Sequence, residues 1–328
     1  MFLGSDEVDD LAEPADYVAA VRDGYRQVGE GAPAEPRTAL FGEDPPGMLT
    51  SYSAILPETG GMGGYTYTAG FGASDAWFLT PLFDAESGEP LAILDGASTN
   101  PYKTGAAGAV AVDELARADA DTVAVIGSGP QARGQLATTA TVREFETGRV
   151  YSPTREHREA YAAEMSDRTG IDVTAVGSAA AAVDGADVVI TATTADEPVV
   201  ASEDLDPGTH VTAMGQYHPG KRELDTETIR RATYVPDLRA RATQDAGSFL
   251  AAVEAGVVSE DHVHAELGEV VAGERPGRTS PDELTVFDSG GTGIETVAAA
   301  TMLYERAVAR DRGTPLSVSP ASEALTGR

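Results

Sequence analysis

The chain contains no cysteine and only two lysines among its 328 residues. The absence of cysteine excludes disulfides, thiolate nucleophiles and metal sites with sulfur ligands, and it fits an intracellular protein. No apolar run approaches the roughly 18 residues that a membrane span requires. The chain starts with MFLGSDEVDD, which is acidic where a secretory signal would be basic. We therefore expect a cytoplasmic protein that does not enter a membrane.

Positive charge is scarce throughout the sequence. Lys and Arg together number 23 against 53 Asp and Glu, which gives a formal net charge of −30. Self-repulsion of this size destabilises a compact chain in dilute buffer, whereas near-molar salt shortens the Debye length to about 3 Å and screens it. The composition therefore indicates a salt-adapted protein from a halophile. The sequence offers no basic patch to displace counterions, so we expect no nucleic-acid partner.

The pattern of apolar residues changes near Asp119. Residues 49–95 consist of short apolar stretches, rich in aromatic and β-branched types and punctuated by Gly and Pro, which predicts an antiparallel sheet. From residue 122 to residue 290, strand-like stretches alternate with helical ones, which predicts a parallel sheet wrapped by helices. The fold class is therefore α/β, with a Rossmann-type parallel sheet and a second, α+β part.

The stretch TVAVIGSGPQARGQ places a glycine pattern between an apolar strand and a helix. Gly127, Gly129 and Ala132 fit the spacing G-x-G-x-x-A. Gly127 permits the tight turn, Gly129 lets the backbone approach a pyrophosphate, and Ala132 lets the helix pack closely. We expect these residues and Gln131 to bind a dinucleotide. The alternative is a glycine turn that arose by chance.

The choice between NAD(H) and NADP(H) is set where the second strand of the parallel sheet ends. An enzyme that uses NAD places Asp or Glu there, against the ribose 2′-hydroxyl. This chain has Ser152, Thr154 and Arg155 instead, a set suited to a 2′-phosphate. We therefore predict that NADP(H) is preferred over NAD(H). The alternative is that Arg155 simply begins a solvated helix.

Several stretches, in this order, resemble the ornithine cyclodeaminase and mu-crystallin family, which includes archaeal-type alanine dehydrogenases and ketimine reductases. They include PLFDAESGEPLAILDG, KTGAAGAVA, VIGSGPQARGQL, GADVVITATT, GTHVTAMG, PGKREL and DELTVFDSGGTGIETVAAATMLYERA. The resemblance implies a homodimer, a nicotinamide cofactor, and an amino or imino acid held by its carboxylate. It also implies a Rossmann domain over 120–293, with 1–119 and 294–328 forming a substrate-binding and dimerisation domain.

The resemblance also suggests roles for individual residues. Arg37 matches the family's arginine that grips the substrate carboxylate, and Lys103 stands where the family usually has a second arginine for the same task. A lysine there keeps the charge and loses the two-pronged geometry. Further positions that the resemblance places at the cofactor are Thr104, Thr193, Met214 and Gly291.

Two family positions are changed in this chain. The family has a lysine in the sheet after the first arginine, but no Lys or Arg lies between Arg37 and Lys103, and Tyr65 falls near the vacant place. The family also has an aspartate shortly after AMG, where this chain has Gln216, Tyr217 and His218. Tyr65, Tyr217 and His218 are therefore the predicted catalytic proton or hydrogen-bond donors.

Three other features are predicted to be structural. Lys221, in PGKREL, is expected to belong to a turn. His262 and His264 form an H-x-H pair without a visible third ligand, so no metal site is predicted. Glu295 is expected to cap the last helix and do nothing more.

These observations predict an NAD(P)H-dependent oxidoreductase that acts on a small imino, keto or amino acid. Without the family's aspartate, a substrate ammonium lacks its obvious counter-charge, which favours an imine or carbonyl substrate. Two alternatives stay open. One is an NADP(H)-binding protein with little or no turnover, and the other is a cyclodeaminase with relocated catalytic groups.

The net charge yields a prediction about stability. We expect the urea midpoint of unfolding to rise from dilute buffer to about 2 M KCl, because salt screens the repulsion between carboxylates. Circular dichroism in matched urea series measures the midpoint. A midpoint that stays constant or falls with KCl would contradict salt adaptation.

Overall fold

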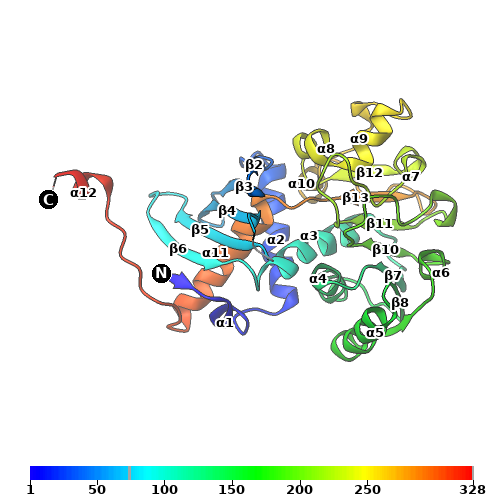
Figure 1. Cartoon of the computed structure of the whole chain (residues 1–328), viewed down its shortest axis with the longest axis horizontal. Helices are drawn as coiled ribbons and strands as arrows, with labels where there is room; N and C mark the ends of the chain where they lie inside the picture. Colours follow the sequence, from blue (N-terminus) through cyan, green and yellow to red (C-terminus); the bar gives the residue numbers. More distant parts are fainter. Residues whose placement is uncertain (73–74, 327–328) are drawn as a thin grey trace.

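A computed structural model describes residues 1–72 and 75–326, which form two sheets with helices between and around them (Figure 1). Sheet A has six described strands in the order β1-β6-β5-β4-β3-β2. Its strands are β1 (Phe2–Leu3), β2 (Thr38–Glu43), β3 (Pro46–Leu56), β4 (Gly61–Gly70), β5 (Trp77–Asp84) and β6 (Pro90–Asp95). Strands β2 to β6 pair antiparallel, as predicted for residues 49–95, and β1 adds a parallel edge to β6.

Sheet B has seven described strands, and every pairing in it is parallel. The order is β12-β13-β11-β10-β7-β8-β9, so the first five strands along the chain follow the doubly wound 3-2-1-4-5 arrangement. This confirms the predicted Rossmann-type sheet. Its strands are β7 (Thr122–Ile126), β8 (Thr147–Tyr151), β9 (Asp172–Ala175), β10 (Val188–Thr191), β11 (His210–Ala213), β12 (Thr233–Pro236) and β13 (Thr285–Asp288).

The helices divide between the two sheets. Those that accompany sheet A or lie between the sheets are α1 (Ser5–Val8), α2 (Pro14–Gly29), α3 (Asn100–Leu115), α10 (Leu267–Val271) and α11 (Gly293–Ala309), whereas α12 (Ala321–Thr326) lies apart from both sheets (Figure 1). Those that accompany sheet B are α4 (Pro130–Thr139), α5 (Arg155–Thr169), α6 (Ala179–Val183), α7 (Thr226–Arg231), α8 (Arg239–Asp245) and α9 (Gly247–Glu254), with 3-10 turns at Ser202–Asp204 and Glu260–His262. In the described part of the chain, no helix is long and apolar enough to cross a membrane.

Helix α11 covers the buried face of sheet A. Alternate residues of β3 are buried, so Tyr52, Ala54 and Leu56 point to one side of the sheet. Ala54 and Leu56 share an apolar core with Ile294, Val297 and other residues of α11. Helix α11 follows β13, which pairs with the edge strand β12, and it carries the chain from sheet B back to sheet A (Figure 1).

Helices α3 and α4 join the two halves and approach each other at glycine positions (Figure 1). A Cβ atom on Gly134 would lie 2.1 Å from the carbonyl oxygen of Pro101, and one on Gly105 would lie 2.6 Å from the carbonyl oxygen of Gly134. Both distances are shorter than real Cβ contacts, so these positions exclude any larger residue. The close packing fixes the start of α4 against the first turns of α3.

Candidate active site

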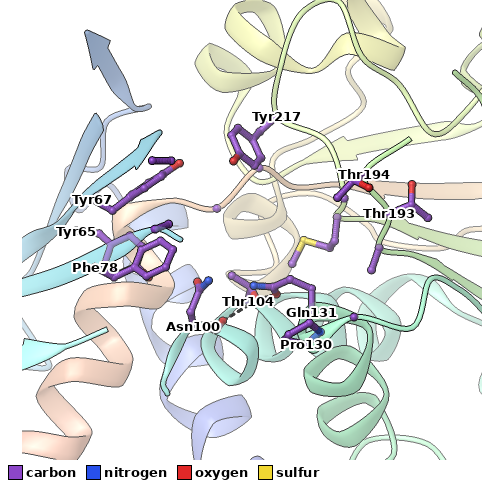
Figure 2. Close-up of a pocket in the computed structure, with 18 of the residues that line it drawn as sticks. Tyr65, Tyr67, Phe78, Asn100, Thr104, Pro130, Gln131, Thr193, Thr194 and Tyr217 are labelled. Atoms are coloured by element: carbon purple, nitrogen blue, oxygen red, sulfur yellow. Dashed lines mark hydrogen bonds between the residues drawn. The ribbon is translucent and has the colours of Figure 1, made fainter. Parts of the chain in front are cut away.

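A cleft of about 330 Å³ lies between the two sheets, at the carboxyl ends of β7, β10 and β11 (Figure 2). In parallel α/β sheets, ligands bind at this end of the strands. Sheet A contributes Tyr52, Tyr65, Tyr67, Ala69 and Phe78 to the lining, and Ala76, just before β5, adds to it. The rest of the lining comprises Asn100, Thr104, Gly129, Pro130, Gln131, Ala192, Thr193, Thr194, Met214, Gly215, Tyr217, Gly290 and Gly291.

The glycine turn after β7 has the shape that a dinucleotide needs. Gly127 has φ +122°, and a Cβ there would lie 2.3 Å from the carbonyl oxygen of Ala192, so only glycine fits. Gly129 is the N-cap of α4, and a Cβ on it would meet no atom within 4 Å. The backbone at Gly129 therefore faces open space at a helix N-terminus, where a pyrophosphate is favoured. Ala132 is fully buried behind it.

Thr104 and Gln131 connect the glycine turn to α3. The Thr104 hydroxyl donates a hydrogen bond to the Gln131 side-chain oxygen, and both residues line the cleft (Figure 2). One helical turn further along α4, Gln135 donates to the Thr104 carbonyl at 3.0 Å. The structure thus brings together two of the predicted cofactor residues that lie far apart in the sequence.

Glu223 holds the two loops that carry Thr193 and Met214. Its carboxylate accepts hydrogen bonds from the backbone nitrogen atoms of Thr193 and Gly215, each at 2.7 Å, and from the Thr191 hydroxyl at 2.9 Å. Burial raises the pKa of Glu223, and these donors act against the shift. Sequence reasoning missed this residue, although it lies in the PGKREL stretch, because the loops that it joins are not adjacent in the sequence.

The predicted NADP-selecting residues lie beside the glycine turn and outside the cleft lining. Ser152 directly follows β8, and its hydroxyl lies 2.9 Å from that of Ser128 in the glycine turn. Thr154 is the N-cap of α5. The Arg155 side chain is 73% exposed and pairs with Glu159 in the next turn of its helix.

Aromatic rings form the sheet A wall of the cleft. Tyr52 and Tyr65 are register partners on β3 and β4, and their ring centroids lie 5.4 Å apart. Tyr65 stacks on Phe78 at 5.3 Å, and Tyr67 lies two residues further along the same face. Desolvation raises the pKa of Tyr65 and Tyr67, so both hydroxyls stay protonated at neutral pH. The alternation in SYSAI and YTY is the signal by which Tyr52 and Tyr67 could have been predicted.

Arg37 is buried behind the cleft wall and is not among the residues that line the cleft, and its polar groups are all close to protein atoms. Its Nε lies 3.1 Å from an Asp245 carboxylate oxygen, and its Nη2 donates to the Gly290 carbonyl. The guanidinium carbon lies 4.4 Å from the centroid of the Tyr217 ring, which covers it. Arg37 thus spans the gap between sheet A and the turn after β13.

A fully buried arginine, Arg241, organises the acids behind Arg37. It pairs with Asp237 at 2.7 Å, with Asp288 at 2.8 Å and with Asp245 at 3.5 Å. Asp237 in turn accepts a hydrogen bond from the backbone nitrogen of Gly290 at 3.0 Å. The network fixes both Arg37 partners, the Asp245 carboxylate and the Gly290 turn.

Lys103 is buried directly behind the aromatic wall. Its ammonium lies 4.5 Å from the Tyr65 ring centroid and 3.8 Å from a carboxylate oxygen of Glu295. Glu295 does form the predicted capping box with Thr292, but the prediction that it does nothing more is wrong, because it also pairs with Lys103. Lys103 itself is not among the residues that line the cleft.

The remaining predicted residues lie in different places. Tyr217 lines the cleft and points toward Tyr67 (Figure 2), whereas His218 is exposed and outside the lining. Lys221 pairs with Asp196 at 2.7 Å on the surface. His262 and His264 bond to the carbonyl oxygens of Ile229 and Pro276, so each ring has its own backbone partner.

Comparison with known proteins identifies relatives along nearly the whole chain. The model of the ornithine cyclodeaminase/mu-crystallin family matches residues 1–311. A Delta(1)-pyrroline-2-carboxylate reductase of Bacillus cereus is 36% identical and covers 72% of each chain. The solved reductase of the same name from Thermococcus litoralis, in complex with NADH and L-proline, has a TM-score of 0.92 at 32% identity, covering 96% of this chain and 100% of that one. An archaeal alanine dehydrogenase dimer with bound NAD has a TM-score of 0.90 at 32% identity, covering 97% and 98%.

The position of Glu223 generates a prediction for cofactor binding. In Glu223→Gln an amide NH2 faces a backbone N–H, and a buried donor left unpaired costs about 1–3 kcal/mol. We expect a lower free energy of unfolding in urea and a weaker affinity for NADPH, measured by its fluorescence at molar KCl. Glu227→Gln, which changes an exposed carboxylate on the neighbouring helix α7, is the control. Equal NADPH affinity in the two variants would contradict the role of Glu223.

Proposed function

The chain belongs to the ornithine cyclodeaminase/mu-crystallin family, and on this premise we propose that it is an NAD(P)H-dependent oxidoreductase that acts on a small imino, keto or amino acid. The observation that carries the proposal is the position of Tyr52. Its ring lines the same cleft as the glycine turn, and two buried cations lie close behind the cleft wall, the Arg37 guanidinium 5.8 Å and the Lys103 ammonium 5.9 Å from the ring centroid. A carboxylate near Tyr52 would experience both positive charges.

The cofactor half of the cleft fits a nicotinamide dinucleotide. The open space at Gly129, the donors at the start of α4 and the loops held by Glu223 support this assignment. When bound, the reduced nicotinamide supplies a hydride to a C=N or C=O group. The residues that would hold the cofactor are Thr104, Gly127, Gly129, Gln131, Ala132, Thr193, Met214 and Gly291.

The substrate half would bind and orient the acid. Arg37 and Lys103 attract the carboxylate, while the rings of Tyr52, Tyr65 and Phe78 provide an apolar surface against which a flat imine can pack. We assign residues 1–119 and 294–328 to substrate binding and dimerisation, and residues 120–293 to cofactor binding.

Reduction of an imine or a carbonyl also needs a proton at the heteroatom. Tyr65 and Tyr217 line the cleft and are the candidates for this donor; the Tyr65 hydroxyl donates to the Gly96 carbonyl at 3.5 Å and would have to exchange that acceptor for the substrate. His218 lies outside the lining, so its participation would require the loop after β11 to move. A tyrosine hydroxyl with a raised pKa serves as a hydrogen-bond donor to developing negative charge.

We propose that the protein works as a homodimer in the cytoplasm. Leu40, Trp77 and Leu79 on sheet A are 65%, 71% and 52% exposed, which is an apolar surface of the kind that a second copy covers. The dimeric archaeal alanine dehydrogenase supports the same arrangement.

We further propose NADP(H) as the preferred cofactor, and Ser152→Asp tests this. A carboxylate at this position would repel a 2′-phosphate and accept hydrogen bonds from a ribose 2′-hydroxyl. We expect the NADPH dissociation constant to rise about tenfold, equivalent to about 1.4 kcal/mol, and that of NADH to fall. Fluorescence titrations measure both constants. Ser259→Asp adds the same charge at an exposed site and should leave them unchanged; equal effects of the two variants would refute the assignment.

The proposed activity is tested by following NADPH absorbance at molar KCl with cyclic imino acids and with 2-oxo acids plus ammonia. We expect oxidation with the imino acids, because the two buried cations and the aromatic wall suit a cyclic imine that bears a carboxylate. NADPH binding without oxidation of any substrate would instead indicate a binding protein. Ammonia release from ornithine with no net change in the cofactor would indicate a cyclodeaminase.

A further inference from the structure

Lys103 and Glu295 form a buried ion pair between two helices that meet beneath the cleft. Lys103 lies on α3 and is 1% exposed, and Glu295 lies on α11 and is 0% exposed. The distance of 3.8 Å between ammonium and carboxylate allows ionic attraction and exceeds hydrogen-bond length. Burying two charges costs desolvation free energy. A buried ion pair is therefore stable only where each charge is compensated by its partner or by hydrogen bonds.

Glu295 is held in place by its own helix. Its two carboxylate oxygens accept hydrogen bonds from the backbone nitrogen and the hydroxyl of Thr292, each at 2.5 Å. One of these oxygens lies close to Gly291, which lines the cleft. The carboxylate is therefore fixed next to the cleft lining at Gly291, and the oxygen that accepts from the Thr292 backbone nitrogen is also the one that faces Lys103.

Lys103 is less completely satisfied than its partner. Within residues 1–72 and 75–326, its ammonium has no hydrogen-bond acceptor. It lies over the face of the Tyr65 ring, which is a cleft wall residue. The Tyr65 ring therefore separates the ammonium from the cleft, so Lys103 acts on a ligand there through its charge and not through a direct hydrogen bond.

We propose that Glu295 is a positioning residue for the substrate site, one whose fixed carboxylate keeps Lys103 charged and directed at the aromatic wall. This inference rests on the proposed function in one respect, that the cleft binds a carboxylate. A helix cap alone does not require a buried carboxylate, because the Thr292 hydroxyl already accepts from the backbone nitrogen of Ile294 at 3.1 Å. Pairing with Lys103 explains why a negatively charged residue is buried at this position, which capping alone does not explain.

The electrostatics of the pair give the direction of the effect. Burial lowers the pKa of Lys103 to about 8, the Glu295 carboxylate opposes that shift, and Arg37 adds to it. Burial raises the pKa of Glu295, and Lys103 and the Thr292 donors act against it. The ionisable groups that face the pair from the packed elements are Arg37, Tyr52 of β3, Tyr65 of β4 and Tyr25 of α2. Removing the Glu295 charge must therefore lower the pKa of Lys103 further.

Because the chain has so few lysines, the pKa of Lys103 can be measured directly. Lys103 and Lys221 are the only lysines, so protein labelled with carbon-13 and nitrogen-15 lysine gives two side-chain signals. Lys221→Arg, at a surface pair with Asp196, identifies the Lys103 signal. Titration of that signal gives the pKa of Lys103 without substrate, cofactor or turnover.

The central comparison is Glu295→Gln, which keeps the shape and removes the charge. We expect the pKa of Lys103 to fall by at least about 1 pH unit relative to the unmodified protein. Glu305→Gln, at an exposed position of the same helix, should leave it unchanged. An unchanged or raised Lys103 pKa in Glu295→Gln would overturn the proposal. Should that variant not fold, Glu295→Asp keeps the charge at a greater distance and should give a smaller decrease.

A ligand measurement connects the pair to the cleft. The affinity for pyrrole-2-carboxylate, an unreactive flat acid, is measured by calorimetry from pH 6 to pH 10 at molar KCl. We expect binding to weaken as Lys103 deprotonates near pH 8 and to weaken at a lower pH in Glu295→Gln. Identical pH profiles in the two proteins would refute the positioning role. Failure to oxidise NADPH with any imino acid would refute the proposed function alone, since the lysine titration does not depend on turnover.

Discussion

Helices α3 and α4 lie so close together that no side chain fits between their backbones at Gly105 and Gly134. This packing constraint sets the geometry of the whole cleft. Helix α3 carries Lys103 and Thr104, and α4 begins at the glycine turn, so one contact places Lys103 relative to the glycine turn. A larger residue at either glycine would separate the two halves of the site before it affected either sheet.

The two buried cations behind the cleft wall, Arg37 and Lys103, are balanced by acids from other elements. Arg37 shares Asp245 with Arg241, and Lys103 faces Glu295. Each cation thus has a carboxylate partner, and each also lies close to a tyrosine ring of the cleft wall. In a chain with a net charge of −30, these internal pairs keep two buried cations next to the aromatic wall.

The sequence allowed the local parts of this arrangement to be predicted, because strand alternation, the glycine turn and the order of the elements are encoded in neighbouring residues. Both sheets agreed with the patterns that predicted them. The partners of Lys103 and the role of Glu223 were missed, since each depends on residues brought together only by the folded chain. Glu295 shows the difference well: its capping box with Thr292 is a local pattern, whereas its contact with α3 is not. Tyr52 was missed for another reason, because its alternation with Ala54 and Leu56 resembles ordinary core packing.

The chain passes between the two halves only after α3 and again at residues 289–292, within the described part of the molecule. The second passage contains Gly290 and Gly291, which line the cleft. A hinge motion of one half relative to the other would therefore bend the chain at residues that line the cleft. Such a motion would also change the position of the Gly290 carbonyl, which accepts a hydrogen bond from Arg37. Opening of the cleft to a dinucleotide would then be coupled to this hydrogen bond.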